Sequence, residues 1–322
     1  TQKNGRRHST ASAYLDPVRR RSNLNVFTNA HVKKLLIEGK RAVGVSYDVD
    51  GKAEEVRAAA SVIVSAGAVQ SPQLLELSGI GAPALLREHG IEPLHELPGV
   101  GENYRDHFAA RLNWRGNQRI TLNEDTKGLR FAREIIKYAF TRRGILTFTA
   151  GIGHGFVRSR PELETPDCQF FFVHGSFGDA NTRALDDEPG MTIGVYQCRP
   201  ESQGSIHIGS PDPYAPPKIR PNFLSQQIDC ETLVGGMRIA RQVGEADALA
   251  RYRAYEMNPG PERQSDEELL DYARSTGATT YHVMGTCKMG AVDDPMAVVD
   301  PSLKVQGMEG LTGVIVERNG DL

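Results

Sequence analysis

Residues 281–289 read Tyr-His-Val-Met-Gly-Thr-Cys-Lys-Met and place a histidine between an aromatic residue and a glycine-containing turn. An imidazole titrates near neutral pH, so His282 can accept and return a proton under physiological conditions. We therefore interpret His282 as the candidate general base. A lone histidine is more often structural than catalytic, so this interpretation depends on the rest of the sequence.

Metal binding is an alternative for the same segment. His282 and Cys287 could each ligate a metal, but no second pair stands at a suitable spacing. Cys168, Cys198 and Cys230 are far apart and form neither a zinc motif nor a dense disulfide framework, which favours a reducing compartment. We expect no metal site, and we interpret Cys287 as a small packing residue.

The composition excludes several classes of protein. A chain of 322 residues usually forms about two domains. Its 38 lysine and arginine residues nearly balance 40 aspartate and glutamate residues, which argues against a nucleic-acid partner. The chain contains no evident membrane segment, because no apolar run approaches the roughly 18 residues of a spanning helix. The N-terminus lacks a signal pattern, so we favour a cytoplasmic protein.

The first part of the chain predicts a meander of strands and then a strand-turn-helix unit. Asp50-Gly51 is a strong hairpin signal, and residues 61–64 form an apolar run typical of a strand buried on both faces. The next small residues, 65–68, allow close approach of a ligand to the backbone. Strands are predicted at residues 24–28, 32–37, 42–49 and 52–58.

The helix that follows is expected to begin with Ser71 as its cap and Pro72 at its first position, and to end at Gly79. Residues 79–84 loosely match a G-x-G-x-x-A dinucleotide fingerprint. They follow a helix rather than a strand, so we interpret them as the helix exit.

The second half predicts further elements. Residues 97–107 are rich in turn formers and charges, which indicates a surface loop. Residues 129–140 form an amphipathic helix that we expect to pack in the core, with a membrane-surface helix as the alternative. Other predicted elements are strands at 169–173, 191–196 and 204–208, a helix at 230–243 capped by Asp229, and a helix opened by a Ser265/Glu268 capping box and ending near Thr276.

Residues 281–290 and 67–81 together resemble motifs of the glucose-methanol-choline (GMC) family of flavin-dependent alcohol oxidoreductases. The resemblance covers nearly the whole chain. It implies an α+β fold, in which an α/β remainder of an FAD-binding domain joins an antiparallel-sheet substrate domain. The implied domains are residues 1–106 (partial FAD-binding domain), 107–275 (substrate-binding domain) and 276–322 (return to the FAD-binding domain).

The resemblance also implies the roles of particular residues. FAD is the implied cofactor, with Val32, Ala66, Gly67 and Tyr281 at its site. His282 would accept the hydroxyl proton of an alcohol while hydride passes to the flavin. His107 resembles a residue of a connecting stretch near the cofactor and is not expected to be catalytic.

The chain departs from the family pattern at both ends. It begins at Thr1 without an upstream G-x-G-x-x-G fingerprint, and after Leu311 it lacks the Asp-Ala-Ser element and the second active-site residue. We therefore expect a C-terminal fragment of a longer enzyme. Whether this chain alone binds flavin stays open.

The sequence specifies the substrate and the electron acceptor less closely than it specifies the family. Relatives that oxidise choline carry a carboxylate where this chain has Ile152, which disfavours choline and leaves a primary or aromatic alcohol. The electron acceptor could be oxygen or a quinone. Two alternatives to oxidation remain, namely a flavin-containing lyase of the same family and a non-catalytic fragment.

Overall fold

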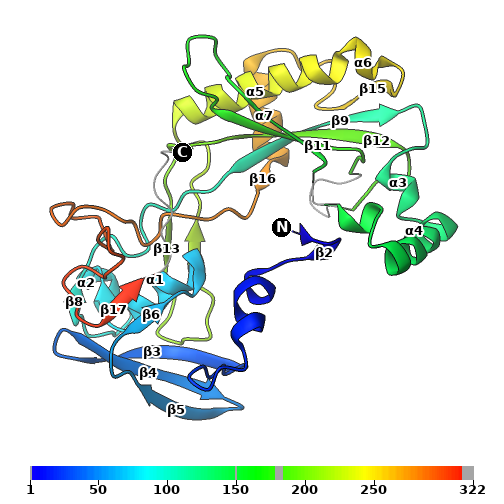
Figure 1. The fold of residues 1–322 in the computed structure, drawn as a ribbon. Coiled ribbons are helices and arrows are strands. Elements are labelled where there is room, and N and C mark those ends of the chain that lie inside the picture. Colours follow the sequence, from blue (N-terminus) through cyan, green and yellow to red (C-terminus); the bar gives the residue numbers. More distant parts are fainter. Residues whose placement is uncertain (1, 149–150, 178–183, 314–322) are drawn as a thin grey trace. The chain divides into compact units, whose positions relative to one another are not determined.

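The computed structural model of the chain describes residues 2–148, 151–177 and 184–313. These residues form two compact units built from segments that alternate along the sequence, and Figure 1 draws their elements. Helices and mainly antiparallel sheets occur in both units, so the predicted α+β class is confirmed. Unit 1 comprises Thr1–Val26, His107–Arg199 and Gln227–Thr280, and unit 2 comprises Phe27–Asp106, Pro200–Gln226 and Tyr281–Leu322.

Unit 1 is built on an antiparallel sheet in which β9 occupies a central position between β12 and β15. The short strand β16 also pairs with β9. Along the main path the strands are β10 (Gly153–Val157), β11 (Cys168–Val173), β12 (Gly190–Gln197), β9 (Phe108–Gly116) and β15 (Arg253–Asn258), with β16 at Ala278–Thr279.

Two helices, α5 (Gln227–Glu245) and α7 (Asp266–Thr276), pack against this sheet (Figure 1). Trp114 of β9 is fully buried and donates its indole N–H to Glu245 at 3.0 Å, which joins α5 to the sheet. The predicted capping box of α7 is confirmed, because the Ser265 hydroxyl accepts the Glu268 N–H at 3.2 Å and the Glu268 carboxylate accepts the Ser265 N–H at 2.9 Å.

The remaining elements of unit 1 are short, apart from α4. They are β1 (Gln2–Lys3), β2 (Arg6–Arg7), the helical turns η1 (Ala11–Leu15), η2 (Asp16–Val18) and η3 (Ile145–Thr147), and the helices α3 (Leu122–Asp125), α4 (Gly128–Thr141) and α6 (Asp247–Ala250).

Unit 2 contains the predicted meander as a three-stranded antiparallel sheet. Asp50 and Gly51 both have positive φ (51° and 77°), so the predicted hairpin turn is confirmed. The strands are β3 (Ala30–Glu38), β4 (Arg41–Val49) and β5 (Lys52–Arg57).

The helix α1 (Gly67–Leu77) follows β6 (Val62–Val64), which pairs in parallel with β17 (Leu311–Gly313). Buried side chains from β3, β6, α1 and residues 298–311 share one apolar cluster. The other elements of unit 2 are β7 (Ile80–Gly81), which pairs with β8 (His95–Glu96), the helix α2 (Pro83–Glu88), and the hairpin of β13 (Ser205–His207) and β14 (Lys218–Arg220).

Two predictions about local structure are wrong in the first third of the chain. Residues 24–28 are not a strand, because their alternation finds no partner strand. The middle residue of β6, Ile63, is 61% exposed, so this strand is not buried on both faces. The exit of α1 is as predicted, since Gly79 follows the helix with a φ of +82°.

The start of α1 also differs from the prediction. Its N-cap is Ala66, so Ser71 is not the cap and Pro72 lies inside the helix instead of at its first position. Proline removes the N–H that would bond to the carbonyl four residues earlier, which here belongs to Ala68. That carbonyl finds another donor, as described below.

Three later predictions need correction. Residues 97–107 form no exposed loop, since several of them are buried. The helix α5 begins at Gln227, before its predicted cap Asp229. The strand predicted at residues 204–208 is present as β13, in a separate hairpin. The amphipathic helix α4 exists, but most of its apolar side chains are exposed and it is not a core helix.

The unit boundaries differ in part from the domains expected from the family resemblance. Residues 1–26 lie in unit 1 and residues 200–226 lie in unit 2. The assignment of unit 1 to substrate binding and of unit 2 to flavin binding stays a proposal.

Candidate functional site

The predicted base, His282, follows a residue in a strained backbone conformation. Tyr281 has a φ of +62°, in the left-handed region that side chains with a Cβ rarely occupy. The His282 backbone N–H donates to a carboxylate oxygen of Asp106 at 2.9 Å, and the Tyr104 hydroxyl donates to the other oxygen at 3.2 Å. Asp106 is 2% exposed. The buried Asp106 carboxylate therefore fixes the backbone of His282, the candidate base.

The next residues pair with the segment just before Asp106. Arg105 and Met284 exchange backbone hydrogen bonds of 2.9 and 2.8 Å, and the Asn103 side-chain amide donates to the Gly285 carbonyl at 3.1 Å. Gly285 has a φ of +86°, and a Cβ there would lie 2.2 Å from the Asn103 carbonyl oxygen. Only glycine fits, so this position of the motif is required by backbone geometry.

The pairing explains why residues 97–107 are not an exposed loop. Gly101 donates its N–H to the Thr286 carbonyl at 2.9 Å, which continues the ladder begun by Arg105. Polar backbone groups can be buried when they find such partners. The turn formers and charges of this stretch predicted exposure because its pairing partner lies far away in the sequence.

Thr286 joins the His282 segment to the start of α1. Its side chain is fully buried, and its hydroxyl donates to the Ala68 carbonyl at 2.6 Å. This is the carbonyl that Pro72 leaves without a helical N–H donor. Proline inside α1 thus allows the helix to accept a hydrogen bond from the segment that carries the candidate base.

The N-cap and first residue of α1 are exposed. Ala66 and Gly67 are exposed, Gly67 has a φ of +90°, and a Cβ placed on it would meet nothing within 4 Å. The Ala66 N–H donates to the Ser71 hydroxyl at 3.1 Å, which holds the turn. Small exposed residues at the N-terminus of a helix suit close approach of a ligand that carries phosphate groups. These residues fit the predicted flavin site.

The predicted site residues of unit 2 are all partly or largely exposed. Tyr281 is 68% exposed, Val32 is 38% exposed, and the His282 side chain is exposed as well. Thr286 connects the segment of Tyr281 and His282 with the turn of Ala66 and Gly67. Val32 lies outside that network.

Val32 belongs to β3, which contacts the other end of α1. The Leu35 N–H of this strand donates to the Ser78 hydroxyl at 2.9 Å. The same helix α1 therefore contacts the strand that carries Val32, a predicted FAD contact, and the segment that carries the candidate base.

The contacts of His107 and the burial of Cys287 are typical of residues with a structural role. A ring nitrogen of His107 lies 3.1 Å from the Cys198 carbonyl oxygen, and its ring stacks on Tyr196 with centroids 4.7 Å apart. Burial raises the pKa of Cys287 to about 12, so this thiol stays protonated at neutral pH. Within the described ranges, no three histidine, cysteine or acidic side chains are arranged to hold a metal ion.

A second polar cluster joins α1 to β13. Glu76 is fully buried and accepts from His207 Nδ1 at 2.6 Å and from the Ile208 N–H at 2.8 Å. The other ring nitrogen of His207 donates to Glu102 at 3.1 Å. The pKa of His207 is raised, mainly by its hydrogen bond to Glu76. This cluster fixes the end of α1 that lies away from the exposed turn.

Sequence reasoning missed Asp106, Thr286 and the Glu76 cluster. A usable signal for Thr286 was the proline inside the helical motif, since it leaves one carbonyl in need of a donor. Asp106 gave no comparable signal, because its partner is a backbone N–H 176 residues away.

Known proteins resemble this chain over nearly its whole length. The family models described as GMC oxidoreductase match residues 1–109 and 200–314. The alcohol dehydrogenase [acceptor] of Pseudomonas putida is 40% identical over 314 residues, which cover 97% of this chain and 56% of that protein. Oxygen-dependent choline dehydrogenase 1 of Chromohalobacter salexigens is 39% identical over 311 residues, which cover 97% and 55%.

A solved structure with the same fold is formate oxidase of Aspergillus oryzae RIB40, which was studied for its FAD modification. It has a TM-score of 0.84 and 24% identity and covers 92% of this chain and 56% of that protein. The chain thus spans little more than half the length of the proteins it resembles. The family models and the identity to curated relatives support FAD as the cofactor, and they show that this chain belongs to the GMC oxidoreductase family.

Proposed function

We propose that the protein to which this chain belongs is an FAD-dependent oxidoreductase that acts on the CH–OH group of an alcohol, with His282 as the proton acceptor. Membership of the GMC family supports the reaction class. The names of two relatives, an alcohol dehydrogenase and a choline dehydrogenase, support an alcohol donor. The observation that best supports this proposal is the 2.9 Å hydrogen bond from the His282 backbone N–H to the Asp106 carboxylate, which fixes the backbone at the candidate base.

The proposed cofactor contacts are Val32, Ala66, Gly67 and Tyr281. The backbone of Ala66, Gly67 and Val32 would approach the cofactor closely, while the Tyr281 ring would lie beside the flavin ring. When bound, FAD supplies the acceptor for the hydride that leaves the alcohol carbon.

The chain's own task is to handle the hydroxyl proton. Removing that proton makes the oxygen electron-rich and favours departure of hydride from the neighbouring carbon. His282 would hydrogen-bond the hydroxyl and take its proton onto a ring nitrogen. Proton transfer needs donor and acceptor within hydrogen-bond distance, so a fixed backbone at this residue supports the role.

For the substrate, we propose a primary or aromatic alcohol that carries no quaternary ammonium group. Ile152 stands where choline-oxidising relatives are expected to carry a carboxylate, and its side chain is 50% exposed. An apolar side chain gives no electrostatic attraction to a cation. Oxygen and a quinone both remain as acceptors to be tested.

The experiment uses the full reading frame and, beside it, the 322-residue chain. Flavin absorbance of the purified proteins reports cofactor binding, and anaerobic addition of alcohols reports hydride transfer by bleaching. We expect His282→Ala to retain flavin and to slow bleaching by about 10²- to 10⁴-fold, the usual contribution of a general base. The matched control is His89→Ala, in the C-cap of α2, which should bleach at the unaltered rate.

The possible outcomes separate the alternatives. Bleaching of His282→Ala at the unaltered rate would reject His282 as the base. Cleavage of a hydroxynitrile without bleaching would identify a lyase. Absence of flavin from both proteins would reject the oxidoreductase assignment and favour a non-catalytic protein.

A further inference from the structure

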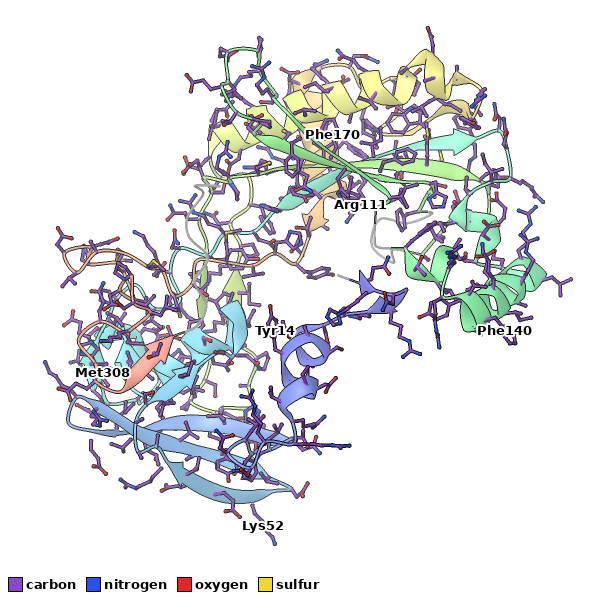
Figure 2. The ribbon with its side chains drawn as sticks, viewed as in Figure 1. Tyr14, Lys52, Arg111, Phe140, Phe170 and Met308 are labelled. Atoms are coloured by element: carbon purple, nitrogen blue, oxygen red, sulfur yellow. The ribbon has the colours of Figure 1, made fainter. Side chains whose placement is uncertain are left out.

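The helix α4 (Gly128–Thr141) exposes the apolar side chains that its sequence pattern would bury. Leu129 is 90% exposed, Ile136 is 59% exposed and Phe140 is 86% exposed. At 100° per residue these three lie within one narrow arc, and Ile135 and the two alanines of the helix extend it. Figure 2 labels Phe140 near the end of this helix. A continuous apolar strip therefore faces away from the interior of unit 1.

The buried side of α4 is held by a charged residue. Glu134 is 6% exposed, accepts the Ile145 N–H at 3.2 Å, and pairs with Lys137 at 3.3 Å. The helix is thus fixed with its acidic side chain inward and its apolar strip outward. The buried Glu134 carboxylate sets the rotation of α4 about its own axis. In this orientation the apolar strip stays exposed.

Positive charge borders the strip. Glu134 is the one acidic residue of the helix and it is buried, so the exposed charges of α4 are all cationic. Arg133 follows the apolar arc around the helix, with Lys137 and Arg130 beyond it. Two more arginines, Arg142 and Arg143, come directly after the helix.

The combination favours a lipid surface over other partners. A helix with an apolar face and a cationic face is the pattern of segments that lie in the interface of anionic membranes. A two-fold contact with a second copy would place the same cations against each other, which costs free energy. None of the described helices is long and apolar enough to cross a bilayer.

Neighbouring residues extend the same surface. After the helix, Leu146 is 41% exposed and Phe148 is 48% exposed. An isolated exposed apolar residue is ordinary, whereas several in one short segment mark an interaction site. We propose that residues 128–148 form a docking surface for anionic lipid bilayers, with Leu129 and Phe140 inserted among the acyl chains and the cations against the headgroups.

The test is flotation of the 322-residue chain with vesicles of phosphatidylcholine alone and of phosphatidylcholine and phosphatidylglycerol in equal parts. We expect strong binding to the anionic vesicles and weak binding to the neutral ones, with binding reduced by salt. The double variant L129S/F140S should lower the partition coefficient by about tenfold or more, since each apolar side chain contributes to insertion. Both positions are exposed, so serine there leaves the folded state intact.

Two matched variants complete the design. Arg133→Gln with Arg143→Gln should weaken binding to anionic vesicles several-fold and leave binding to neutral vesicles unchanged. Val292→Ser alters a valine that is 83% exposed in unit 2 and should bind as the unaltered chain does.

The proposal fails if the chain does not float with anionic vesicles or if L129S/F140S binds as well as the unaltered chain. It also fails if the chain is a dimer on size-exclusion chromatography that the L129S/F140S substitutions dissociate, because the strip would then bind a second copy. None of these results depends on flavin or on catalysis, so they are independent of the proposed function.

Discussion

The His282 backbone N–H and the Asp106 carboxylate lie 2.9 Å apart and join two segments separated by 176 residues. The carboxylate is buried and also accepts the Tyr104 hydroxyl. A hydrogen bond to a charged group in low-dielectric surroundings is stronger than one in water. This contact stabilises the strained conformation of Tyr281 and fixes the backbone from which the candidate base projects.

We expect Asp106→Ala to slow anaerobic flavin reduction by about 10- to 100-fold, because the His282 N–H loses its buried partner and the base loses its position. Asp106→Asn keeps an oxygen acceptor and should restore most of the rate. Flavin absorbance should be equal in both variants, since Asp106 acts on position and is not proposed to contact the cofactor. Equal loss of rate in the two variants would show that the negative charge itself matters and would contradict a positioning role.

The Thr286 hydroxyl should contribute about 1 kcal/mol to stability, because its removal leaves the part-buried Ala68 carbonyl without this donor. Urea unfolding of Thr286→Val measures the loss, and Thr286→Ser, which keeps the hydroxyl, is the matched control. Adding Pro72→Ala supplies an N–H for the same carbonyl. We therefore expect the double variant T286V/P72A to be more stable than T286V. If the changes in unfolding free energy of T286V and P72A simply add, the two residues do not share the Ala68 carbonyl in this way.

Protonation of His207 should stabilise the folded state. Its pKa is raised in the folded protein, so its contribution is complete below the unfolded value near 6.5 and is lost as pH rises through the folded pKa. The free energy of unfolding should therefore fall above about pH 6.5. Urea unfolding at several pH values tests this.

The control for that prediction is His207→Gln, which carries no titrating group. Its unfolding free energy should lack this part of the pH dependence. An unaltered pH profile in His207→Gln would assign the dependence to other groups.

The packing of α5 on the sheet predicts a size limit at Gly244. A Cβ there would lie 2.1 Å from the Trp114 ring, which is fully buried and cannot move away easily. Overpacking of this kind costs about 1–3 kcal/mol, so Gly244→Ala should lower the thermal midpoint. Gly155→Ala is the control, because a Cβ on that strand glycine meets nothing within 4 Å. If Gly244→Ala and Gly155→Ala have similar thermal midpoints, α5 can shift to make room for the added methyl group.

Predictions from the sequence succeeded where the determining chemistry is local. The Asp50-Gly51 turn, the end of α1 at Gly79 and the Ser265/Glu268 capping box each depend on residues a few positions apart. The family assignment is confirmed by comparison and rested on two continuous motifs. The roles of His282, Tyr281 and the other site residues stay predictions.

Predictions failed where a distant partner decides the outcome. Residues 97–107 have the composition of an exposed loop, yet backbone pairing with residues 284–286 lets them be buried. The helix α4 has the pattern of a core helix, yet burial of Glu134 against the Ile145 N–H turns its apolar side outward. Neither the pairing nor the rotation can be read from periodicity, which describes one segment at a time.

The sequence by itself determined the family, the α+β class and the position of the candidate base, because short motifs and local turn chemistry carry that information. Only the tertiary structure decided that Pro72 leaves the Ala68 carbonyl to Thr286 and that the His282 backbone is held by Asp106. The physical reason is that a buried donor or acceptor must find a partner, and the partner is chosen by packing across the whole unit.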